Sequence, residues 1–171
     1  MEDEIVNRVV KSNLVTIDLE DFYPKGKRIL FDIADWLYEG LILKEKDFRE
    51  KVINYNWEQH KDQYVALTCS LDAIIPSWAY LLITTKLAPF VKKTVVGKLE
   101  LLETVIFQEV IYNLDIRNFK NKPIIIKGCS NIPIPQTAYT MLIGKLQPYV
   151  KSIMYGEACS TVPLYKEKKI K

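Results

Sequence analysis

The three cysteines of this chain form its most distinctive chemical pattern, because each is followed directly by serine. The pairs are Cys69-Ser70, Cys129-Ser130 and Cys159-Ser160. Thiolates are preferred ligands of soft metals, so three converging thiols would suit a zinc ion or an iron–sulfur cluster. The chain has no Cys-x-x-Cys motif, which makes this signal weaker than a paired-cysteine site. The odd number of cysteines disfavours a set of disulfides.

The segments that must position these cysteines belong to an internal repeat, because the chain matches itself when shifted by 59 residues. Among the matches, Ala79-Tyr80 falls on Ala138-Tyr139, Lys86-Leu87 on Lys145-Leu146, and Gly97 on Gly156. The two units cover residues 43–98 and 102–157, with an N-terminal extension (1–42) before them and a basic tail (164–171) after them. A period of this size is typical of a duplicated supersecondary unit. We therefore predict one domain with approximate two-fold internal symmetry.

Each unit is predicted to run helix, strand, helix, strand. The expected strands are residues 64–67, 94–96, 124–126 and 153–155, and the second helix of each unit begins near Pro76 or Pro135. Outside the repeat we expect helices at 4–11 and 35–43, a strand at 14–17 and a loop at 21–26. The fold class is therefore α/β: a single domain whose mostly parallel sheet is flanked by helices and built from two pseudo-symmetric repeat units.

All three cysteines follow a predicted strand. The carboxyl ends of parallel strands share one edge of a sheet, where ligands of open α/β folds bind. If the strands before Cys69 and Cys129 are neighbours, about 4.8 Å apart, their thiols can meet there. Asp72, Glu100, Glu157 or solvent would complete the ligand set. Glu100 occupies the position in the first unit that Cys159 occupies in the second.

Two other functions are compatible with the same cysteines. In the first, Cys69 or Cys129 is an activated nucleophile of a thiol-dependent enzyme, with His60, the one imidazole, as a possible base. A half-exposed histidine at a helix end is the simpler interpretation of His60. In the second, the cysteines only pack at strand ends, with turn or cap hydrogen bonds from the serines, and the protein is a non-catalytic interaction module with an exposed apolar patch. Asp32 and Asp35, which could act as an acid–base pair, are better explained by a loop-to-helix boundary.

Composition excludes several classes of function. The 171 residues contain 24 basic and 21 acidic side chains, and this small excess of positive charge disfavours nucleic-acid binding. No apolar segment reaches the length of about 18 residues that a membrane span needs, and the acidic start is unlike a secretory signal. Phosphate-binding glycine motifs and the zinc-protease motif are absent. We therefore expect a cytoplasmic protein without a membrane or nucleic-acid partner, more consistent with a non-catalytic role than with an enzyme.

Three stretches resemble a bacterial family known as domain of unknown function 2480. They are residues 31–50, residues 69–80, which begin at Cys69-Ser70, and residues 153–165, which contain Cys159-Ser160. The resemblance covers nearly the whole chain, and the Cys-Ser segments are its most specific part. The family carries no assigned activity. Its genomic context implies a connection with sulfur mobilisation, and hence proteins of iron–sulfur cluster assembly as partners.

Overall fold

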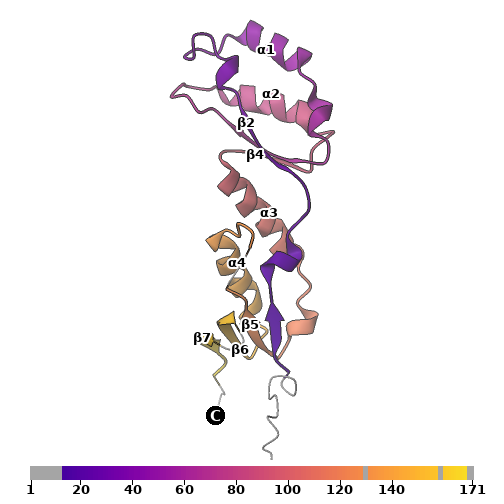
Figure 1. Ribbon diagram of the computed structural model, residues 1–171, viewed down its shortest axis with the longest axis vertical. Helices are drawn as coiled ribbons and strands as arrows, with labels where there is room; N and C mark the ends of the chain where they lie inside the picture. The colour runs from indigo at the N-terminus through magenta and orange to yellow at the C-terminus, as the bar shows by residue number, and fades with distance from the viewer. Residues whose placement is uncertain (1–12, 129–130, 158–159, 169–171) are drawn as a thin grey trace, which may run out of the picture. The chain divides into compact units, whose positions relative to one another are not determined.

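Seven strands form two separate sheets in the computed structural model, which describes residues 13–128, 131–157 and 160–168 (Figure 1). The first sheet has the strand order β1-β5-β6-β7, and its strands are β1 (Val15–Ile17), β5 (Pro123–Ile126), β6 (Ser152–Glu157) and β7 (Ser160–Lys166). The second has the order β2-β3-β4, with strands β2 (Arg28–Asp32), β3 (Tyr64–Thr68) and β4 (Lys93–Val96). All pairings are parallel except that of β6 with β7. The single sheet expected from the sequence is therefore wrong, whereas the α/β class and mostly parallel pairing are confirmed.

Each sheet belongs to its own compact unit. The inner unit is the continuous segment Pro24–Ile106, and the outer unit combines Met1–Tyr23 with Phe107–Lys171. The inner unit thus interrupts the outer one between β1 and β5. Helix α3 (Leu99–Asn113) extends across the boundary at residue 106, so its first half belongs to the inner unit and its second half to the outer unit.

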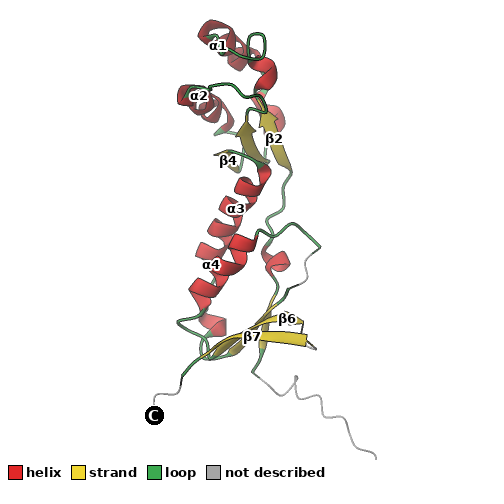
Figure 2. Ribbon diagram, turned by 90° about the vertical axis from the view of Figure 1, so that its left-hand side faces the viewer, coloured by secondary structure: helices red, strands yellow, loops and turns green. Residues whose placement is uncertain are grey.

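The inner sheet carries helices on both faces. Helices α1 (Glu45–Asn54) and α2 (Ser77–Leu87) cover one face, where Phe48 and Ile83 pack in one cluster with Val65 and Leu67 of β3 (Figure 2). On the other face, Ala66 packs with Leu102 and Ile106 of α3. The continuous apolar sequence of β3 follows from this arrangement, because successive side chains of a strand point to opposite, buried faces.

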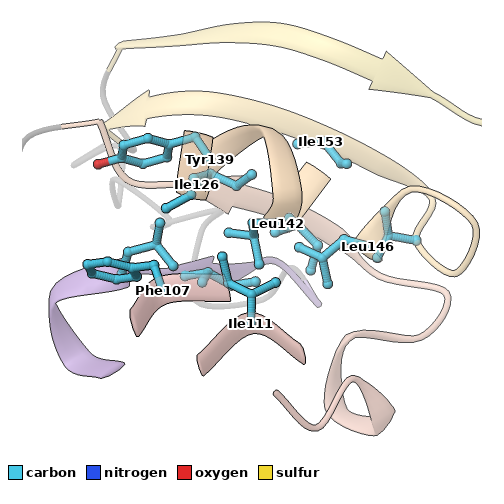
Figure 3. Close-up of a cluster of buried hydrophobic side chains, with 12 residues drawn as sticks. Phe107, Ile111, Ile126, Tyr139, Leu142, Leu146 and Ile153 are labelled. Atoms are coloured by element: carbon cyan, nitrogen blue, oxygen red, sulfur yellow. The ribbon is translucent and has the colours of Figure 1, made fainter. Parts of the chain in front are cut away.

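The outer sheet buries one face against α4 (Gln136–Leu146) and the second half of α3. Figure 3 shows the cluster: Phe107 and Ile111 come from α3, Leu142 and Leu146 from α4, and the strands contribute Ile126 and Ile153. These side chains are at most 3% exposed. Leu142 and Leu146 recur at the four-residue spacing that the helical stripe of the sequence predicted.

The helix–strand–helix–strand order is confirmed in both segments, from α1 to β4 and from α3 to β6. The strand at 14–17 is confirmed as β1, whereas the helix expected at 4–11 lies outside the described residues. The helix expected at 35–43 is wrong. Only a short 3-10 helix, η2 (Ala34–Trp36), forms, because Glu39 and Gly40 adopt positive φ and turn the chain so that Tyr38 pairs with Ile42.

The basic tail (164–171) begins inside a strand rather than after the last one. Leu164 to Lys166 belong to β7, which pairs with β6 in antiparallel register. The N–H of Glu167 also donates to the carbonyl of Lys151 (2.8 Å). Tyr165 packs against the outer core, and its burial explains why this segment adds to the sheet.

None of the helices in the described part of the chain combines the length and the apolar character that crossing a bilayer requires.

Candidate functional site

The carboxyl edge of the inner sheet brings together residues from β2, β3 and α2. Asp32 is the last residue of β2 and lies in register with Thr68, the last residue of β3. Cys69 and Ser70 follow Thr68 directly. This edge holds the single cysteine among the residues whose side chains the structure describes.

The Asp32 carboxylate organises this edge. Its Oδ1 accepts hydrogen bonds from the N–H groups of Ala34 (2.9 Å) and Ser70 (3.0 Å). Desolvation, the largest influence, raises the pKa of Asp32. The Ser70 hydroxyl and the two N–H donors outweigh it, so the pKa is below its usual value. Asp32 therefore caps the turn into η2 and ties the β2 loop to the Cys-Ser loop, which supports the boundary interpretation over an acid–base pair with Asp35.

Cys69 is half-buried next to this carboxylate. Its Sγ donates a weak hydrogen bond to the carbonyl of Leu71 (3.6 Å), and its side chain packs against the aromatic and aliphatic cluster under α1 and α2. The phenol of Tyr80 on α2 also lies in this environment: desolvation first, and then the charges of Cys69 and Asp32, raise the pKa of Tyr80. The thiol of Cys69 and the carboxylate of Asp32 thus both lie close enough to the Tyr80 phenol to influence it electrostatically.

The corresponding edge of the outer sheet begins with an ion pair. Asp18 follows β1 and Lys127 follows β5, and Nζ of Lys127 lies 2.6 Å from Oδ2 of Asp18. Desolvation raises the pKa of Asp18, but the hydrogen bond from Lys127, the N–H of Glu20 and the lysine charge together hold it below its usual value. The same hydrogen bond raises the pKa of Lys127. Near this pair, Tyr155 Oη donates to the carbonyl of Gly128 (3.3 Å).

Two of the predicted metal ligands, Cys129 and Cys159, lie outside the described residues. In the sequence, Cys129 comes three residues after the end of β5, and Cys159 two residues after the end of β6. Strands β5 and β6 are parallel neighbours, with Ile126 in register with Tyr155. The suggested adjacency of the strands before Cys69 and Cys129 is wrong, because β3 and β5 belong to different sheets.

The predicted supplementary ligands are divided between the units. Asp72 is exposed in the loop after β3, and Glu100 is exposed on the inner-unit half of α3. Glu157 is half-buried at the end of β6 in the outer unit. Among the residues that the structure describes, no group of three or more histidine, cysteine, aspartate or glutamate side chains is placed to hold a metal ion.

His60 lies at the opposite end of β3 from Cys69. It is buried in η3 (Trp57–His60), with hydrogen-bond contacts to Tyr55 Oη (2.9 Å) and Gln63 Oε1 (3.2 Å). Its ring also packs against Phe31 (5.8 Å between ring centroids) and stacks on Tyr55 (5.8 Å). His60 is thus a packed core residue, not the half-exposed one expected, and both of its ring nitrogens contact Tyr55 or Gln63.

The sequence-based interpretation missed β2 and the paired roles of Asp18 and Asp32. A signal was present, because each aspartate ends a short apolar run that follows a polar segment. The two runs, 14–17 and 29–31, occupy equivalent places at the start of their sheets. Their aspartates lie only 14 residues apart, outside the 59-residue repeat, so the shift comparison did not align the two runs.

A family model described as a protein of unknown function (DUF2480) matches residues 3–167 of the chain. No curated protein and no solved structure matches this chain.

Proposed function

Because the chain belongs to the DUF2480 family, whose description assigns no activity, we propose a function from its strand-end loops. The protein is a non-catalytic, cytoplasmic binder of a soft metal ion or an iron–sulfur cluster that uses the thiolates of Cys69, Cys129 and Cys159. Cys129 and Cys159 follow strands of the outer sheet, and Cys69 follows a strand of the inner sheet. Cytoplasmic thiols stay reduced and available as ligands. Proteins of iron–sulfur cluster assembly are the corresponding partners, as the family resemblance implies.

One observation carries this proposal: β5 and β6, the strands that precede Cys129 and Cys159, are hydrogen-bonded parallel neighbours. Neighbouring strands lie about 4.8 Å apart, and Zn–S and cluster Fe–S bonds of about 2.3 Å allow two thiolates at that spacing to share a metal. Glu157, at the end of β6, is available as a further ligand at the same edge.

The repeat supports assigning Cys69 an equivalent role in the inner unit. We propose that the two units are structural copies, because the same backbone hydrogen bond recurs at an offset of 59 residues. Asp62 N–H donates to the Phe90 carbonyl (2.9 Å), and Asn121 N–H donates to the Tyr149 carbonyl (2.8 Å). Asp62 and Asn121 also share a positive φ near 58° (59° and 57°).

In the inner unit, a metal bound at Cys69 would take its remaining ligands from nearby carboxylates or from solvent. Asp32 shares the edge with the thiol, and its low pKa keeps it ionised at neutral pH. Asp72, three residues after Cys69, and Glu100 are exposed and able to supplement it. Carboxylates are harder ligands than thiolates, so this set suits zinc better than a cluster.

Analysis of the purified protein tests the proposal. We would measure iron, zinc and acid-labile sulfide per chain after purification without oxygen, for the wild type and for Cys129→Ser, Cys159→Ser and Cys69→Ser. These are matched variants, because each replaces one sulfur by oxygen in a Cys-Ser pair. A metal held at the outer edge is lost from Cys129→Ser and Cys159→Ser alike, and its loss from Cys69→Ser as well indicates a ligand set that includes all three thiols.

Wild-type protein with neither metal nor sulfide contradicts the proposal, as does full metal content in Cys129→Ser and Cys159→Ser. Thermal unfolding of each variant, followed by circular dichroism, separates loss of the metal from loss of the fold.

A second candidate, the interaction module, is favoured by the apolar side chains around the inner Cys-Ser loop. Ile74 is 94% exposed. Leu71 contacts the neighbouring loop that contains Gly40, since a Cβ built on Gly40 would lie 3.4 Å from the Leu71 side chain. Leu41 and Ile42 of that neighbouring loop are also exposed. This function predicts metal-free protein whose cysteines all react slowly with iodoacetamide, and rapid alkylation of a single thiol contradicts it.

A further inference from the structure

Lysines gather at the amino ends of the parallel strands in both units. In the inner unit they precede or begin β2, β3 and β4, and they are Lys25, Lys27, Lys61, Lys92 and Lys93. In the outer unit they precede β5 and β6 or follow the antiparallel β7, and they are Lys120, Lys122, Lys151, Lys166 and Lys168. We call these two sets the inner and outer basic edges. Together they hold ten of the chain's twenty lysines.

Backbone contacts show that the inner basic edge is one continuous surface. The Lys27 carbonyl accepts from Tyr64 N–H (2.9 Å), and Lys92 N–H donates to the Gln63 carbonyl (2.8 Å). Lys92 Nζ reaches the Lys25 carbonyl (2.8 Å), which joins the loop before β2 to the start of β4. Three neighbouring strands are about 10 Å wide, so these lysines lie within about one Debye length of one another.

The outer basic edge is assembled in the same way. Lys151 N–H donates to the Lys122 carbonyl (3.0 Å), and Glu167 N–H donates to the Lys151 carbonyl (2.8 Å). Lys166 lies in register with Ser152, the first residue of β6, so β7 brings its last residues to this edge. Lys120 and Lys151 fall on Lys61 and Lys92 under the 59-residue shift, so both units carry lysines at matching positions.

Among the described residues that precede or begin these strands or follow β7, the acidic ones are Asp62 in the inner unit and Glu167 in the outer unit, and Glu103 of α3 pairs with Arg28 at the start of β2. Lysines therefore outnumber carboxylates at both edges. By contrast, the carboxyl ends of the strands carry the carboxylates Asp18, Asp32 and Glu157, of which Asp18 is paired with Lys127. The small net charge of the chain therefore conceals a concentration of lysines at the amino ends of both sheets.

We propose that the basic edges are docking surfaces for an acidic segment of a partner protein, rich in aspartate and glutamate. Complementary charge of this kind steers association and sets its dependence on salt. The arginines near these edges are already engaged, which argues against nucleic acid. Arg28, the first residue of β2, donates to Glu103 Oε1 (2.8 Å) and to the carbonyls of Pro24 and Gly26. Arg117, at the start of η4 (Arg117–Phe119) before Lys120, pairs with Asp115 (2.6 Å). Arginine is the usual bidentate reader of phosphates and guanine bases.

This surface is distinct from the proposed metal site. Within the inner unit, β3 separates the basic edge from the Cys69 loop by about 16 Å, the length of a five-residue strand. A partner bound at the basic edge leaves the cysteine edge accessible. The inference therefore stands or fails independently of metal binding.

Fluorescence anisotropy with a labelled peptide of ten glutamates tests the inference on the full chain. The inner-edge variant is Lys27→Glu/Lys61→Glu, and the outer-edge variant is Lys120→Glu/Lys151→Glu. The control is Lys46→Glu/Lys98→Glu, which changes the net charge equally at exposed lysines in the first turn of α1 and just before α3, on the carboxyl side of the inner sheet. We expect wild-type binding that weakens as salt increases, a loss of about tenfold in affinity in each edge variant, and less than about twofold in the control.

Equal losses in the control and edge variants would reduce the effect to net charge and overturn the inference. A single-stranded deoxythymidine decamer that binds as tightly as the peptide, with the same sensitivity to the edge variants, would assign the edges to nucleic acid instead. Absence of peptide binding to the wild type at low salt also contradicts it. Lys27→Gln/Lys61→Gln, which removes charge without adding repulsion, should weaken binding in the same direction by a smaller factor.

Discussion

The first strand of each sheet ends at an aspartate, but the two units stabilise that aspartate differently. In the outer unit, Asp18 is paired with the ammonium group of Lys127, which follows β5. In the inner unit, the residue 59 positions before Lys127 is the uncharged Thr68, and Asp32 is held by neutral N–H and hydroxyl donors. The outer carboxylate is therefore charge-balanced, whereas the inner one remains a net negative charge beside Cys69.

This difference matters for metal binding. A negative carboxylate near a thiol attracts a cation, whereas an aspartate–lysine pair does not add to the attraction. Under the proposed metal binding, the inner Cys-Ser loop would depend more on its carboxylates, and the outer loops on the two cysteines that follow β5 and β6.

The largest effects are expected from truncation of equivalent core residues. Ile83 on α2 and Leu142 on α4 are related by the 59-residue shift, and both are fully buried. Ile83→Ala and Leu142→Ala should each lower the free energy of unfolding by about 2–5 kcal/mol. All three tryptophans lie in the inner unit, so their fluorescence during urea unfolding reports on that unit alone. We expect Ile83→Ala to lower the fluorescence midpoint, and Leu142→Ala to lower only the midpoint seen by circular dichroism; equal fluorescence shifts would show that the units unfold as one.

Substituting two glycines, Gly97 directly after β4 and Gly156 within β6, should lower the free energy of unfolding by smaller and unequal amounts. Both Gly97 and Gly156 adopt positive φ (147° and 125°). A Cβ on Gly97 meets the flexible Leu101 side chain at 2.8 Å, whereas a Cβ on Gly156 collides with the Ser160 backbone carbonyl. Gly97→Ala should cost about 1–2 kcal/mol and Gly156→Ala about 3 kcal/mol or more, as measured by chemical unfolding. A larger cost at Gly97 would contradict the pairing of Gly156 in β6 with Thr161 in β7.

Replacing Asp18 or Asp32 by asparagine should lower the free energy of unfolding by about 1–2 kcal/mol at pH 7, because charged hydrogen bonds are lost. Because each folded-state pKa lies below the ordinary value of 3.8, the stabilisation is complete above that value and is lost as the pH falls through the lower folded-state pKa. Asp18→Asn and Asp32→Asn should therefore differ from the wild type at pH 7 and converge with it near pH 2 in thermal unfolding. Salt should reduce the effect of Asp18→Asn alone, since only Asp18 has a lysine partner; equal salt dependence would remove the distinction.

The smallest effect is expected from building into the inner unit an aspartate–lysine pair like that of Asp18 and Lys127 in the outer unit. Thr68→Lys places an ammonium group at the position equivalent to Lys127, within the register of Asp32. The new pair should stabilise the protein by about 0.2–1 kcal/mol at low salt, and 1 M NaCl should abolish the gain. If Thr68→Lys instead destabilises the protein at low salt, an ammonium group at position 68 does not reach Asp32.

The repeated segments were predictable because their hydrophobic patterns are strong. The continuous apolar run of β3 predicts a buried strand, and the four-residue spacing of apolar residues in α2 predicts a helix. Both elements form close to the expected bounds. Residues 28–43 were not predictable in the same way. The run that forms β2 is short, and the helix expected at 35–43 fails because backbone φ at Glu39 and Gly40, rather than side-chain pattern, decides the turn.

For the candidate site, the sequence located the cysteines at strand ends but not which strands are neighbours. Periodicity describes how one segment is buried, whereas strand order depends on how the whole chain is connected. The insertion of the inner unit between β1 and β5 separates β3 from β5, and no local pattern in the 59-residue repeat reports that insertion. The sequence also did not show that Asp32 ends a strand and that Asp18 follows one, each the first strand of its sheet; the pairing of β1 with β5 and of β2 with β3 shows this.

X-ray absorption at the metal edge of protein purified without oxygen identifies the atoms bound to the metal. We predict a bound metal with at least two sulfur ligands at about 2.3 Å, and one sulfur fewer in Cys159→Ser. A metal surrounded only by oxygen and nitrogen, or a sulfur shell unchanged in both Cys129→Ser and Cys159→Ser, would contradict it.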